Sequence, residues 1–119
     1  MIEKPVFIQG LFAFEGRGLE KPISFPTPAH YIVPSDKRAQ MIYLRAGNSA
    51  DELIYLVLMR NGQVMRYFPV GAKGAIHVPL AVVEDLSPSS VIEVLVAAPQ
   101  GTGMKGAVVV LDIGFMEIA

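Results

Sequence analysis

The sequence has no cysteine and no tryptophan, and it has only two histidines among 119 residues. Without cysteine there is no disulfide bond, no thiolate metal site and no thiol nucleophile. The chain also has no surplus of either charge, because ten Lys and Arg stand against eleven Asp and Glu. A balance this neutral gives no attraction toward nucleic acid or an anionic membrane, so we expect neither as a partner.

Motifs for catalysis and for metal binding are also absent. His30 and His77 stand far apart and alone, whereas a cupin-type metal site needs a His-x-His pair with a further Glu and His. There is no Gly-x-Ser-x-Gly elbow and no phosphate-binding loop. We therefore expect no catalytic residue, no metal and no cofactor, and we predict that the protein is not an enzyme.

No apolar run approaches the roughly 20 residues of a membrane-spanning helix. The apolar stretch at residues 6–14 resembles the start of a secretory signal, but Gln9 and Gly10 interrupt it and the charged Glu15 follows. We expect this stretch to be the first β-strand. The missing cysteine suits a reducing compartment, so the sequence predicts a small soluble domain in the cytoplasm.

Proline and glycine recur along the chain at short intervals, with runs of β-branched and aromatic residues between them. Short strands separated by turn residues in this way are typical of an antiparallel sandwich or barrel. The chain has the length of one domain and, at 52% hydrophobic residues, is too apolar for disorder. We predict an all-β fold, an antiparallel sandwich or jelly roll of about eight to nine strands, as a single domain over residues 1–119. The expected strands cover residues 5–14, 22–25, 30–33, 39–46, 52–60, 63–69, 74–79, 90–98 and 107–118, with room for one helical turn at 80–86.

The strongest local signal is Asn-Gly at 61–62, the preferred pair for a two-residue type I′ hairpin turn. Uninterrupted pairing from this turn places Arg60 opposite Gln63 and Val57 opposite Arg66. Alternation along the two strands then separates two faces. The face expected in the core holds Ile54, Leu56, Leu58, Met65 and Tyr67. The opposite face holds Tyr55, Val57, Met59, Val64, Arg66 and Phe68.

The opposite face is unusual because Arg66 is its only charged residue. A sheet face in contact with water normally alternates with polar residues, and aromatic residues, Met and Arg are enriched at protein interfaces. We predict that this face associates with a second copy, most simply as a two-fold dimer, or binds a ligand. The alternative is that another part of the same chain covers it.

His30 and Tyr31 form the other candidate ligand contact, since they are adjacent aromatic residues in one expected strand. Sugar-binding sandwiches usually stack their ligands on exposed Trp or Tyr, and the absence of Trp weighs against such a platform. The sequence therefore predicts a non-catalytic interaction protein that self-associates and serves as an accessory to a larger protein partner. The alternative function is a small-ligand or carbohydrate-binding module.

The layout of the strands carries a resemblance to a known class. The central hairpin at 53–68, the strand at 76–80 and the paired closing strands that end at 111–118 resemble galactose-binding-like jelly-roll modules. The resemblance implies a β-sandwich and, by analogy, sugar binding. It rests on strand pattern alone, so no functional residue is transferred from it.

Overall fold

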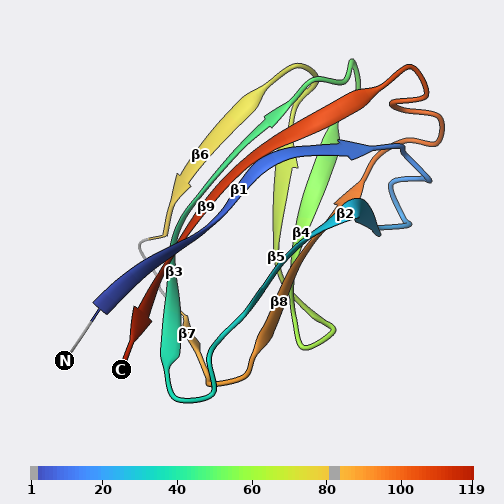
Figure 1. Ribbon diagram of the computed structural model, residues 1–119. Coiled ribbons are helices and arrows are strands. Elements are labelled where there is room, and N and C mark those ends of the chain that lie inside the picture. Colours follow the sequence, from blue (N-terminus) through green and yellow to red (C-terminus); the bar gives the residue numbers. More distant parts are fainter. Residues whose placement is uncertain (1–2, 81–83) are drawn as a thin grey trace.

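In the computed structural model, which describes residues 3–80 and 84–119, the chain forms nine β-strands (Figure 1). No helix occurs in the described residues, and every pair of strands is antiparallel. The predicted all-β, antiparallel fold is therefore confirmed. The strands are β1 (Glu3–Phe14), β2 (Ile23–Ile32), β3 (Arg38–Asn48), β4 (Ile54–Arg60), β5 (Gln63–Val70), β6 (Ala75–Pro79), β7 (Asp85–Leu86), β8 (Val91–Ala97) and β9 (Ala107–Ile118).

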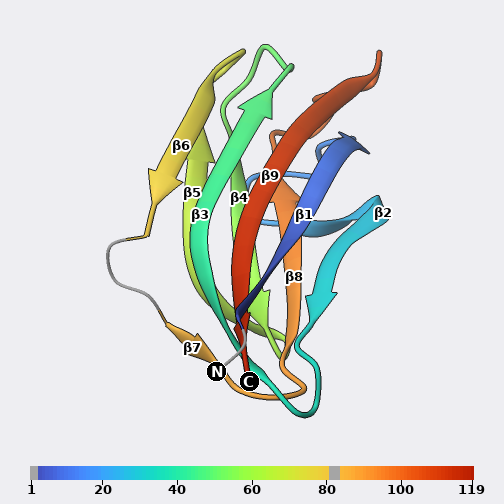
Figure 2. The same ribbon diagram turned by 60° about the vertical axis from the view of Figure 1, so that its left-hand side comes forward.

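The strands form two sheets that pack face to face, and Figure 2 shows one sheet in front of the other. Sheet A has the order β1-β9-β3-β6, with the short β7 also beside β3, and sheet B has the order β2-β8-β4-β5. β1 and β2 lie together along one side of the sandwich, where the rings of Phe12 and Phe25 are 5.4 Å apart. The layers are thus joined by side chains rather than by a shared strand.

The core lies between the sheets and follows the period-2 pattern of the sequence. In β9, Leu111, Ile113 and Phe115 are buried, while Asp112 lies on the outer side of the strand. Burying each side chain of this size contributes about 1.5–3 kcal/mol to the free energy of unfolding. The same alternation buries the inward residues of β4 and β8, which are Ile54, Leu56, Leu58, Ile92, Val94 and Val96.

The Asn61–Gly62 turn is confirmed by its backbone angles. Both residues have positive φ, 50° and 79°, as a type I′ turn requires. The Asn61 side chain also accepts a hydrogen bond of 2.8 Å from the Val91 backbone N–H. The turn therefore closes the β4–β5 hairpin and ties it to the start of β8.

Substituting Gly62→Val should lower the free energy of unfolding by about 1 kcal/mol or more, because a β-branched residue resists positive φ. Denaturation in urea would measure the loss. Gly71→Val is the matched control, since a side chain at Gly71 meets no atom within 4 Å and needs no left-handed backbone. Equal losses in the two variants would contradict strain at the turn.

The register of the β4–β5 hairpin differs from the predicted one beyond the first two pairs. Met59 lies opposite Val64 as expected, but Leu58 lies opposite Arg66, because a bulge leaves Met65 as an extra residue. One extra residue inverts the alternation of the strand from that point on. The predicted faces are therefore wrong for β5 beyond the bulge: Phe68 turns into the core and Tyr67 turns outward.

The structure also differs from two other expected elements. The two strands expected at 22–25 and 30–33 are a single strand, β2 (Ile23–Ile32), whose pairing with β8 is interrupted by an irregularity between Ser24 and Ala29. The helical turn expected at 80–86 falls partly on residues 81–83, which lie outside the described residues. Asp85 and Leu86, at its end, form β7 against β3.

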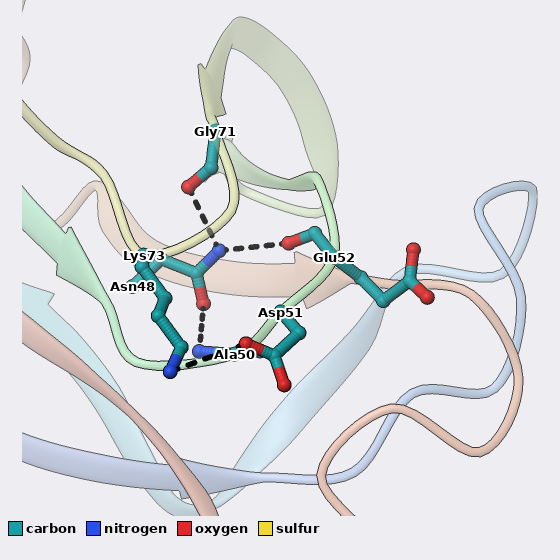
Figure 3. A network of polar contacts seen from close by, with 6 residues as sticks. All are labelled: Asn48, Ala50, Asp51, Glu52, Gly71 and Lys73. Carbon is teal, nitrogen blue, oxygen red and sulfur yellow. Dashed lines mark hydrogen bonds and ion pairs between the residues drawn. The ribbon is translucent and has the colours of Figure 1, made fainter.

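A buried asparagine fixes the loop that joins β3 to β4 (Figure 3). The Asn48 side-chain nitrogen donates to the carbonyl oxygens of Glu52 and Gly71, at 2.9 and 3.1 Å. Its oxygen accepts from the Ala50 N–H at 2.9 Å. A single side chain thus holds two loops, β3–β4 and β5–β6, against each other at one end of the sandwich.

Candidate functional site

A row of four polar side chains crosses the outer face of sheet A. Asp112 of β9 lies directly opposite Gln9 of β1 and Arg45 of β3, and Arg45 lies opposite His77 of β6. Directly opposed residues of antiparallel strands point to the same face, so the four side chains share it. We call them the Asp112 row. Adjacent strands are about 4.8 Å apart, so the row spans about 14 Å.

The carboxylate of Asp112 is the centre of the row. Its Oδ1 accepts hydrogen bonds from Gln9 Nε2 at 3.0 Å and from Tyr43 Oη at 2.8 Å. The Nε of Arg45 is 3.9 Å from Oδ2, and the Arg45 guanidinium lies 5.0 Å from the centre of the Tyr43 ring. The hydrogen bonds from Gln9 and Tyr43, followed by the charges of Arg45 and His77, lower the pKa of Asp112.

Tyr43 can lie across the sheet because its neighbour on β9 is a glycine. Tyr43 pairs with Gly114, and a Cβ at Gly114 would overlap the Tyr43 ring. The ring of His77 is perpendicular to the Tyr43 ring, with centroids 6.2 Å apart. Desolvation and the hydrogen bond to Asp112 raise the pKa of Tyr43, so the hydroxyl stays protonated and continues to donate.

Apolar residues border the Asp112 row on both sides, and small residues on one side leave space beside it. A hollow of about 550 Å³ lies between Arg45, His77 and Val110, over Gly47 and Ala75. Leu11 and Val110 are exposed on one side of the row, and Phe7 is exposed on the other. By register, the bordering rows are Leu11, Val110, Gly47 and Ala75 on one side, and Phe7, Gly114, Tyr43 and Pro79 on the other.

The lowered pKa of Asp112 predicts a pH dependence of stability. A carboxylate whose pKa is lower in the folded state stabilises the fold above its unfolded pKa, and this contribution is lost as the pH falls through the folded pKa. We expect wild type to lose more stability on acidification than Asp112→Asn, in urea titrations at stepped pH. Tyr43→Phe should raise the pKa of Asp112 in an NMR titration, because one hydrogen bond is gone. Identical acid profiles of wild type and Asp112→Asn would contradict the network.

The outer face of sheet B carries most of the face predicted from the hairpin. We call Tyr55, Val57, Met59, Val64 and Tyr67 the tyrosine face. The rings of Tyr55 and Tyr67 are 5.7 Å apart, and Tyr67 is 61% exposed. Val57, in contrast, is 1% exposed, between its cross-strand neighbours Tyr67 and Leu95. The chain itself therefore covers the centre of this face. That the face mediates association or binds a ligand stays a prediction.

The remaining candidate residues lie apart from both faces. Arg66, on the core side of β5, binds Glu84 at 3.1 Å, and Phe68 is buried. His30 and Tyr31 point to opposite sides of β2, so they cannot form one contact. His30 is exposed opposite Glu93.

Tyr31 has a structural role at the other end of the sandwich. Its ring lies 4.7 Å from that of Phe115, and its hydroxyl donates to Glu117 Oε2 at 2.6 Å. Glu117 is buried and also lies 3.7 Å from Lys37 Nζ. Burial and the hydrogen bond to Glu117 raise the pKa of Tyr31 above its usual range. Tyr31 therefore satisfies a buried carboxylate, a role that also explains why it is turned away from solvent.

Sequence reasoning missed the Asp112 row. Its only signal was an outward Asp112 and Arg45 in otherwise apolar strands, and His77 was noted only as an isolated histidine. The described residues contain no cluster of three or more His, Asp or Glu that could hold a metal. They also contain no helix that could serve as a membrane span.

The two packed antiparallel sheets make this chain a β-sandwich of the jelly-roll type. Among solved structures, it is similar to the CBM36-1 domain of a multidomain xylanase from the hindgut metagenome of Trinervitermes trinervoides. The TM-score is 0.57 at 14% sequence identity, over 99% of this chain and 98% of that one. The likeness confirms, for the fold, the resemblance to galactose-binding-like modules. No family model and no curated protein sequence matches the chain.

Proposed function

We propose that the protein is a non-catalytic carbohydrate-binding module, and that an oligosaccharide lies across sheet A along the Asp112 row. The observation that carries the proposal is the in-register row of four polar side chains between apolar borders. At about 14 Å, the row has the length of a short oligosaccharide rather than of one sugar.

The chemistry of the row suits hydroxyl groups, which both donate and accept hydrogen bonds. Arg45 donates, Gln9 does both, and His77 does either, depending on its tautomer. The Nε of Arg45 is too far from Asp112 Oδ2 for a hydrogen bond, so this oxygen keeps lone pairs for a ligand. The apolar borders match the C–H faces of pyranose rings, and the hollow above Gly47 gives room for them.

Two further observations support binding without catalysis. Glycoside hydrolysis normally requires a pair of carboxyl groups on either side of the scissile bond, and the Asp112 row has one. The chain is similar in fold to a CBM36-1 domain, which is one domain of a multidomain xylanase. This similarity supports a module that accompanies a catalytic domain and is not itself catalytic. The same proposal includes that the chain acts as an accessory to a larger partner.

Binding of soluble polysaccharides, measured by affinity electrophoresis and then calorimetry, tests the proposal. Arg45→Ala should weaken binding by tenfold or more, about 1.4 kcal/mol, because a charge-assisted donor is removed from the row. Arg17→Ala is the matched control: Arg17 is as exposed as Arg45, 56% against 55%, and also pairs with one carboxylate. Equal effects of the two variants, or no binding to any glycan in a broad panel, would overturn the proposal.

A further inference from the structure

Over residues 6–14, the free edge of β1 lacks the features that normally prevent strands from pairing with other molecules. β1 pairs with β9, and no strand within residues 3–80 and 84–119 pairs with its other edge. Exposed edges are usually guarded by charges, prolines or short length. β2 carries Pro26 and Pro28, β6 has five residues, and β5 carries Arg66 and Pro69. β1 has twelve residues: Glu3, Lys4 and Pro5 occupy its first end, and residues 6–14, which follow, include no charge and no proline.

Two large apolar side chains stand exposed on this unguarded strand. Leu11 is 71% exposed and Phe7 is 48% exposed, both on the outer face of sheet A. Between them lies Gln9, whose side chain is held toward Asp112 by a hydrogen bond. The outward side chains of the edge strand are therefore apolar, polar and apolar in order, a pattern that is symmetrical about Gln9.

We propose that β1 pairs antiparallel with β1 of a second copy, with the two-fold axis at Gln9. In this register Gln9 faces Gln9 of the second copy, and Leu11 faces its Phe7. A shift by two residues in either direction would place Gln9 opposite Phe7 or opposite Leu11, which mixes polar with apolar neighbours. A shift by one would set outward residues against inward ones. The pattern of β1 is thus complementary to itself in a single register, which is what a two-fold interface requires.

The pairing makes sheet A continuous across the dimer and joins the two Asp112 rows. The order becomes β6-β3-β9-β1 in one copy followed by β1-β9-β3-β6 in the other. Eight strands at about 4.8 Å spacing give one polar row of about 34 Å. Association itself does not depend on the proposed sugar binding, but if that proposal holds, one long polysaccharide would contact both copies and gain avidity.

Because the chain has no cysteine, single-cysteine variants test the register directly. In the proposed dimer the two Cα atoms of residue 9 are about 4.5–5.5 Å apart, within the range of a disulfide. We expect Gln9→Cys to become a covalent dimer on mild oxidation. Leu11→Cys is the control: the two copies of residue 11 are four residues out of register, about 13 Å apart, and should stay monomeric on a non-reducing gel. Equal cross-linking of both variants, or none of Gln9→Cys, would overturn the register.

Light scattering coupled to size exclusion tests the interface without any sugar. Wild type should run as a dimer at tens of micromolar, and Leu11→Lys, which places a charge on the edge strand, as a folded monomer. Val64→Lys is the control, because Val64 is a 48% exposed apolar residue on the tyrosine face; this variant should remain dimeric. A monomeric wild type would refute the proposal. If Val64→Lys dissociated the dimer and Leu11→Lys did not, the interface would be the tyrosine face, and the proposal would also be refuted.

Discussion

Replacing Asn48 with alanine is expected to lower the free energy of unfolding by about 3 kcal/mol. The Asn48 side chain is 4% exposed and makes three hydrogen bonds to the backbone of two loops, as Figure 3 shows. Without it, the Glu52 carbonyl and the Ala50 N–H lose the partner that Asn48 gives them, while the Gly71 carbonyl keeps the hydrogen bond from the Gly74 N–H at 2.9 Å. A buried polar group left without a partner costs about 1–3 kcal/mol. Because Glu52 and Gly71 lie in exposed loops, water can replace part of this loss.

Urea denaturation followed by circular dichroism would measure the effect of Asn48→Ala. Ser49→Ala is the neighbouring control: Ser49 is exposed and makes one side-chain hydrogen bond, to the Val108 N–H at 2.9 Å. We expect it to cost about 1 kcal/mol or less. Asn48→Asp should be at least as damaging as Asn48→Ala, since a carboxylate would face two carbonyl oxygens. If Asn48→Ala behaved like Ser49→Ala, the two loops would be held by something other than this amide.

Truncating Phe115 to alanine should lower the free energy of unfolding by about 3–5 kcal/mol, the range for a buried phenylalanine. Phe115 is 1% exposed and lies on β9 in the middle of sheet A. Its ring also supports that of Tyr31, whose hydroxyl satisfies the buried Glu117. Removing the ring therefore leaves a cavity and frees the side chain that pairs with a buried carboxylate.

Two further variants separate these contributions. Tyr31→Phe keeps the ring against Phe115 and removes only the hydrogen bond to Glu117, so it should cost about 1.5–3 kcal/mol, as for hydrogen bonds to charged groups. Phe115→Leu keeps most of the buried volume and should cost less than Phe115→Ala. Chemical denaturation of all three variants gives the comparison. A loss in Phe115→Ala no larger than in Phe115→Leu would mean that the site collapses around the missing ring.

The two outer faces of the sandwich differ in a way that bears on function. The face of sheet A has a polar row whose members lie in register: Asp112 accepts a hydrogen bond from Gln9 and forms an ion pair with Arg45. Exposed apolar residues lie beside the row. The tyrosine face of sheet B has aromatic side chains that pack on one another and cover Val57. A row of polar side chains beside a hollow offers a ligand both polar contacts and space, which is why the proposed site is on sheet A.

Local pattern in the sequence determined much of the fold. The alternation of apolar and polar residues in 90–98 and 107–118 is enough to determine which side chains of β8 and β9 are buried, because a strand's two faces are set by its own period of two. Asn61 and Gly62 predicted their turn, since positive φ at two successive residues selects few residue types. The all-β class followed from the same short-range signals.

Tertiary structure alone decided the rest. The bulge at Met65 depends on how β5 lies against β4, and it exchanged the faces of Tyr67 and Phe68 although the turn was correctly predicted. The Asp112 row unites residues 9, 45, 77 and 112, and a strand's period says which face a residue takes but not which strand lies beside it. Only the order β1-β9-β3-β6 places Gln9, Asp112, Arg45 and His77 side by side, because pairing between distant strands is set by packing of the whole sandwich.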